Sequence, residues 1–99
     1  MESQFQFVNF TPTLRQETFV KERLMHICEL APSSSYTTAT LKRTDVGYIC
    51  RVEIFDEKTP FIADGTGDLP QFAVETMERS ILEKLHDWKQ HRFSGLSSH

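Results

Sequence analysis

The chain has 99 residues, which suits one ordinary domain with one core and leaves no room for a second catalytic domain. Eleven Lys and Arg against fourteen Asp and Glu give a formal net charge of −3, which excludes nucleic-acid binding by bulk attraction and leaves only a local basic patch for it. Hydrophobic residues make up 38% and charged residues 25%, a composition typical of a globular domain rather than a disordered chain.

No apolar run approaches the roughly 20 residues that span a bilayer, and residues 1–4 lack the basic and then apolar pattern of a secretory signal. These features predict a cytoplasmic protein that does not bind membranes. Cys28 and Cys50 are too few for a disulfide scaffold and too far apart for a metal or redox motif. We expect both to be buried free thiols.

The first third of the chain predicts a strand and then a helix. Residues 4–10 alternate and are rich in Phe, which suits a strand. Thr11 can cap a helix, and Pro12 at its first position loses no needed donor. At 100° per residue the core-facing arc holds Val20, Leu24, Ile27, Cys28 and Ala31, with Leu14 and Met25 at its edge and with Phe19 and Leu30 off it. Residues 32–35 are expected to end the helix.

Residues 36–55 predict a β-hairpin. Segments 36–43 and 48–55 are rich in β-branched residues and flank a turn at 44–47. The second arm has an apolar face and a charged face, made of Tyr48, Cys50, Val52 and Ile54 against Arg51 and Glu53. A short strand is expected at 60–63, ended by residues 64–67.

The last helix is the clearest element. Asp68 with Gln71 resembles a capping box, and Pro70 lies in the first turn, where its missing N–H costs little. One arc of about 120° holds the apolar residues Ala73, Val74, Met77, Ile81, Leu85 and Trp88. We expect the helix to end near Arg92 and residues 93–99 to form a flexible tail.

These elements predict an α+β fold of the order β-α-β-β-β-α. Two helices with single apolar stripes pack most economically on one face of a four-stranded sheet. The sequence therefore predicts a two-layer sandwich, with residues 1–92 as its single domain.

Nothing in the sequence supports catalysis or a bound cofactor. His86 and His91 are five residues apart, about 140° on a helix, which does not suit metal ligands. The segment 64–68 lacks the Lys-Ser/Thr of a phosphate loop and the spacing of a calcium loop. No Ser, Cys or His stands in a nucleophile motif. We expect a protein that is not an enzyme and has no metal site.

The charged residues of the two helices allow two interpretations. Residues 71–92 hold four basic and four acidic side chains, and Glu75, Arg79 and Glu83 follow one another at i,i+4, as on an ordinary solvated face. In the functional interpretation the basic side chains contact RNA phosphates. The candidates are Arg15, Lys21 and Arg23 of the first helix and Arg79, Lys84, Lys89 and Arg92 of the last.

Several local motifs resemble the ribosome hibernation-promoting factors, also called ribosome-associated inhibitor or sigma-54 modulation proteins. The resemblance rests on residues 10–16 (Phe-Thr-Pro-Thr-Leu-Arg-Gln), on Ala63-Asp64-Gly65 before Asp68, and on Ala73-Val74 opening a terminal amphipathic helix. It covers roughly residues 5–92 and implies the fold order derived above. It also implies a protein without the further dimerisation domain of longer members.

The resemblance implies binding to the small ribosomal subunit and its rRNA, in the channel for messenger and transfer RNA, with translation restrained during stress or stationary phase. No DNA binding is implied. Members usually carry basic residues on both exposed helix surfaces, and here Ser80, Glu83 and Asp87 occupy matching positions. Such changes weaken phosphate contacts. The alternative is a divergent protein-binding or regulatory module that kept the fold and lost ribosome binding.

Overall fold

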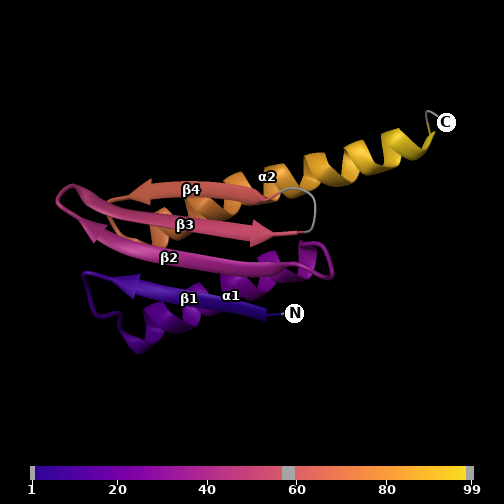
Figure 1. Cartoon of the computed structure of the whole chain (residues 1–99). Helices are drawn as coiled ribbons and strands as arrows, with labels where there is room; N and C mark the ends of the chain where they lie inside the picture. Colours follow the sequence, from indigo (N-terminus) through magenta and orange to yellow (C-terminus); the bar gives the residue numbers. More distant parts are fainter. Residues whose placement is uncertain (1, 57–59, 98–99) are drawn as a thin grey trace.

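A computed structural model describes residues 2–56 and 60–97. The elements follow in the predicted order β-α-β-β-β-α (Figure 1), as β1 (Glu2–Val8), α1 (Leu14–Leu30), β2 (Tyr36–Thr44), β3 (Gly47–Phe55), β4 (Phe61–Gly67) and α2 (Pro70–Ser97). The α+β class and the element order predicted from the sequence are confirmed.

The four strands form one mixed sheet in the order β1-β2-β3-β4. The β1 strand runs parallel to β2, and the other neighbouring strands are antiparallel. Burial alternates along β2, β3 and β4, because successive side chains point to opposite faces. Both helices cover the same face (Figure 1), so the predicted two-layer sandwich is confirmed and the other sheet face is open.

The start of α1 lies two residues later than predicted. Thr13, not Thr11, is the N-cap, and Leu14 replaces Pro12 as the first helical residue. The Thr13 hydroxyl accepts from the Gln16 amide at 3.1 Å, and the Gln16 side chain accepts from the Thr13 amide at 2.9 Å. This reciprocal capping box satisfies two donors that Thr11 would leave unpaired.

The core forms where the two helix stripes meet the sheet. Of the predicted arc of α1, Val20, Leu24, Ile27 and Cys28 are buried and Ala31 is partly buried. The expectation for its edge was wrong, since Leu14 is 78% and Met25 63% exposed. Both lie on the flank of α1 turned away from α2, where no second helix covers them. Phe19 and Leu30 lie on the opposite flank and pack against the core.

The β4 strand continues through the segment that the sequence predicted to end it. Asp64 and Thr66 are exposed, while Ala63 and Gly65 are buried against α2. A Cβ on Gly65 would lie 2.8 Å from Met77 Cα and closer still to the Met77 nitrogen and the Ala73 oxygen. The glycine therefore lets the backbone of α2 cross β4 closely, and it does not break the strand.

The apolar stripe of α2 is buried as predicted, with Trp88 partly buried beside Phe61. The helix begins at Pro70, and the Leu69 carbonyl accepts from Phe72 and Ala73, so the N-cap position is Leu69 instead of Asp68. The predicted end near Arg92 was wrong, because α2 continues to Ser97. No proline follows Pro70 to stop it.

Candidate nucleic-acid interface

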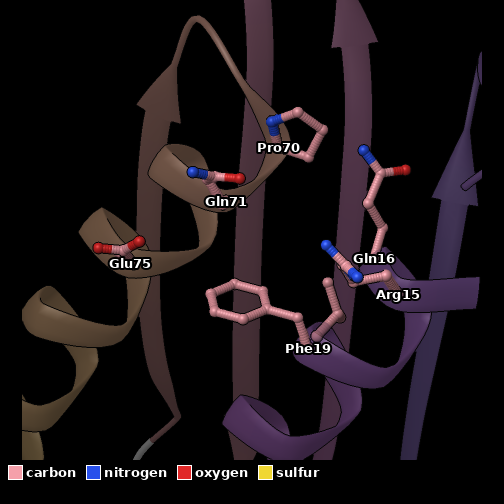
Figure 2. A pocket seen from close by; sticks show the side chains of 7 residues that line it. Arg15, Gln16, Phe19, Pro70, Gln71 and Glu75 are labelled. Atoms are coloured by element: carbon pink, nitrogen blue, oxygen red, sulfur yellow. The ribbon is translucent and has the colours of Figure 1, made fainter. Parts of the chain in front are cut away.

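A groove between the two helices gathers charged, amide and aromatic side chains on the outer side of the helical layer. It measures about 230 Å³ and is lined by Arg15, Gln16, Phe19, Val20, Pro70, Gln71 and Glu75. Figure 2 shows Phe19 reaching from α1 toward α2, with Arg15 on one side and Gln71 and Glu75 on the other. The first turns of α1 and α2 lie side by side here, because the helices run in the same direction (Figure 1).

One turn beyond the groove, an ion pair joins the helices. The Arg23 guanidinium lies 3.3 Å from the Glu78 carboxylate and 5.1 Å from the centre of the Phe19 ring. The Arg23 side chain is 45% exposed and that of Glu78 11%. This position fixes Arg23 at the surface of the helical layer, while Glu78 neutralises part of its charge.

The structure divides the predicted RNA-binding side chains that it describes among different surfaces. Arg15 lines the groove between the helices and Arg23 lies one turn beyond it beside Glu78 of α2, while Lys21 lies on the other flank of α1 beside Ser3 and Phe5 of β1. Eight residues separate Arg15 and Arg23, about 80° around the helix axis, so these two share one side of α1.

The basic residues of α2 are similarly divided. Arg79 lines a shallow hollow of about 420 Å³ with Leu82, Glu83, His86 and Asp87, and Lys89 lies against the end of α1. Lys84 is five residues from both Arg79 and Lys89, about 140° away from each around the helix. The side chain of Arg92 is outside the described part of the structure. Their role in RNA binding stays a prediction.

Acidic side chains interrupt this surface. In α2, residues 70–90 hold three basic and four acidic side chains, and three of the acids, Glu75, Glu83 and Asp87, line the two hollows that contain Arg15 and Arg79. A phosphate near Arg15 or Arg79 therefore also meets a carboxylate within the same hollow. The arrangement can hold a polyanion only weakly and through few contacts.

The sequence did not identify the groove, although one signal was available. Phe19 stood off the core-facing arc of its helix, and the structure places it where α1 meets α2. Gln16 and Gln71 gave no signal for a groove, because the sequence offered them only as part of a motif and as part of a helix start. On the open sheet face, Arg51 lies 3.3 Å from Glu53 and 3.8 Å from Asp64, so its charge is already balanced there.

The described residues offer no metal centre, since no group of three His, Cys, Asp or Glu among them could hold an ion. Both cysteines are buried and free, as predicted. Burial, and secondarily the nearby charge of Asp64, raises the pKa of the Cys50 thiol to about 12, so the thiol is neutral and unreactive near pH 7. Within the described part, neither helix is long and apolar enough to cross a membrane.

Comparison with known proteins identifies the fold. No family profile and no curated protein sequence matches the chain. Among solved structures, the chain is similar to a ribosomal subunit interface protein from Coxiella burnetii, with 12% identity, a TM-score of 0.76, and 91% of this chain and 99% of that one covered. It is also similar to the N-terminal domain of Thermus thermophilus Protein Y, with 8% identity, a TM-score of 0.63, and coverage of 89% and 94%. The fold implied by the resemblance in the sequence is confirmed.

Proposed function

We propose that this protein is a non-enzymatic ribosome-associated factor that binds the small subunit and restrains translation. One observation carries the proposal. The fold matches 99% of a protein described as a ribosomal subunit interface protein, so the similarity covers that whole molecule. The motifs of residues 10–16 and 63–74 support the same assignment.

The outer side of the helical layer is the proposed contact surface. Arg15 and Arg79 are exposed there, and Arg23 is held beside them by Glu78 and Phe19. Guanidinium groups suit phosphate oxygens, which they contact with two parallel donors. The exposed edge of Phe19 and the amides of Gln16 and Gln71 can contact a nucleotide lying in the groove. Such binding positions the protein on RNA without requiring a basic net charge.

The protein would restrain translation by occupying the channel for messenger and transfer RNA, which needs no chemical step. A domain lying where messenger and transfer RNA pass excludes both by volume. The acidic side chains of α2 reduce the number of effective phosphate contacts, so we expect weaker binding and a shallower salt dependence than a fully basic helix surface gives. Ribosome association also accounts for the predicted cytoplasmic location.

Charge reversal on the two faces of the sandwich tests this surface. The variant R15E/R79E reverses two charges on the helical layer, and K42E/R51E reverses two exposed charges on the open sheet face as its matched control. Affinity for isolated bacterial 30S subunits is measured by sedimentation. We expect R15E/R79E to lose about tenfold in affinity for each reversed charge and the control to lose much less. Equal losses in both variants would contradict the proposed surface.

The second candidate function is a protein-binding module, favoured by a specific observation. Leu69 and Phe72 at the start of α2 are 48% and 47% exposed, and acidic side chains follow them along the helix. Affinity capture from a lysate treated with nuclease separates the two candidates. Recovery of one defined protein after nuclease treatment favours the module, whereas recovery that depends on intact RNA favours ribosome binding.

A further inference from the structure

The outer edge of β1 is free and carries few features that prevent pairing. β1 pairs with β2 along Glu2–Val8, and no other strand of the described part pairs with it. The segment contains no Lys, Pro or Gly, the residues with which proteins usually protect an exposed edge. Ser3 to Val8 carry no charge at all. This edge is therefore ready to accept another strand.

The other edge of the sheet differs. β4 follows Pro60, and it contains Asp64 together with Gly65 and Gly67. A charge and glycines weaken strand addition. The free edge of β1 is thus the more favourable of the two for pairing.

An uncovered apolar groove lies beside the same edge. It measures about 290 Å³ and is lined by Ser3 and Phe5 of β1 and by Lys21, Leu24 and Met25 of α1. Met25 is 63% exposed, although its neighbour Leu24 belongs to the core. A strand added to β1 would place apolar side chains into this groove, because its helix-side residues would lie next to Phe5.

We propose that a second copy of this chain pairs with β1 in antiparallel fashion about Phe5, forming a continuous eight-stranded sheet. The order Gln4-Phe5-Gln6 reads identically in both directions, so an antiparallel pair centred on Phe5 places Phe5 beside its own copy and Gln4 beside Gln6. Such an isologous contact closes with two-fold symmetry. The amides of Gln4 and Gln6 then meet on the open face of the sheet, and the two Phe5 rings meet on the face that the helices cover.

Two-fold pairing about an axis perpendicular to the sheet keeps both helical layers on one side. Four strands carry two helices and adjacent strands lie about 4.8 Å apart, so the width of two strands is available for each helix, roughly the 10 Å that a helix with its side chains requires. The α1 helix of each copy would therefore cover the side of the other copy's α1 that carries Met25, without displacing β1. The contact leaves Arg15 and Arg79 outside, so this dimer does not depend on ribosome binding.

A charge exchange on the open sheet face tests the dimer. The side chains of Gln4 and Gln6 are exposed there, and Q4K/Q6K and Q4E/Q6E place like charges opposite each other in the proposed pair. The control I62K/T66K adds two lysines on the same sheet face at the β4 edge. Mass is measured by light scattering after gel filtration, with circular dichroism to show that each variant is folded.

We expect the wild type and the control to show twice the monomer mass, and the two charged variants to show half that value. Mixing the Lys and Glu variants should restore the doubled mass, because opposite charges then face each other. A monomeric wild type at high concentration, charged variants that remain dimeric, or a mixture that stays monomeric would each overturn the proposal.

Discussion

The carboxylate of Glu78, buried on α2, lies 3.3 Å from the guanidinium of Arg23 on α1. This ion pair links the two helices directly, and it also occupies a basic side chain of the proposed RNA surface. Stability and binding therefore make opposite demands on Glu78. The same carboxylate that aligns the helices reduces the charge available to a phosphate.

Replacing Glu78 by Gln should improve RNA binding at little cost. Because Arg23 is 45% exposed, losing the pair costs about 0.5 kcal/mol in the free energy of unfolding. The freed guanidinium adds about one phosphate contact, so the slope of log affinity against log salt should steepen by about 0.7 to 0.9. Urea unfolding and sedimentation with 30S subunits measure the two effects. The control E22Q removes an exposed carboxylate of α1, and an identical slope change in both variants contradicts the account.

Gly65→Ala tests the close crossing of α2 over β4. The added methyl group would overlap the backbone of α2 at Ala73 and Met77, and backbone cannot rotate away as a side chain can. We expect a loss of about 3 kcal/mol in the free energy of unfolding. The neighbouring Thr66 is exposed, so Thr66→Ala should change stability by less than about 0.5 kcal/mol. Equal effects of the two changes would show that α2 does not lie against Gly65.

Two threonines distinguish the observed start of α1 from the one predicted by sequence. Thr13→Ala removes the acceptor for the Gln16 amide and should lower the free energy of unfolding by about 1 kcal/mol. Thr11→Ala, two residues earlier, should have little effect. Urea denaturation of both variants measures the difference. A larger loss of unfolding free energy for Thr11→Ala than for Thr13→Ala would show that Thr11 is the N-cap.

Cys50 predicts a specific change of stability with pH. Its pKa is raised from 9.0 to about 12 in the folded chain, so the buried neutral thiol contributes stability fully below about pH 9 and loses it as the pH rises toward about 12. The loss has a slope of at most about 1.4 kcal/mol per pH unit. Urea unfolding of the wild type and Cys50→Ala across this range isolates the contribution as their difference. A difference that stays constant above pH 9 contradicts it.

The sequence predicted elements where periodicity was strong. The stripe from Ala73 to Trp88 and the hairpin about residues 44–47 were both confirmed, because each depends on a repeat that burial enforces. Local signals were less reliable. Thr11-Pro12 was the predicted start of α1, but the reciprocal hydrogen bonds between Thr13 and Gln16 place the start two residues later. Gly65 read as a strand break, because close contact with a helix distant in the chain is invisible in the local sequence.

The candidate site was harder to predict for a different reason. A helix wheel gives the angular positions of Arg79 and Lys84 around their own helix. It does not show which side of that helix the other helix covers. Only packing shows that Arg23 turns toward Glu78 while Lys21 turns toward β1. A groove formed by Phe19 and Gln71, on different helices, likewise requires the tertiary arrangement. Net charge alone could exclude only a uniformly basic surface.

The central claim is tested most directly by sedimenting the wild-type protein with separated 30S and 50S subunits of bacterial ribosomes across a salt series. We predict saturable binding to the 30S subunit that weakens as salt increases, with little binding to the 50S subunit. Absence of binding even at low salt, or equal retention by both subunits regardless of salt, would contradict ribosome association through the helical layer and would leave the similarity as one of fold.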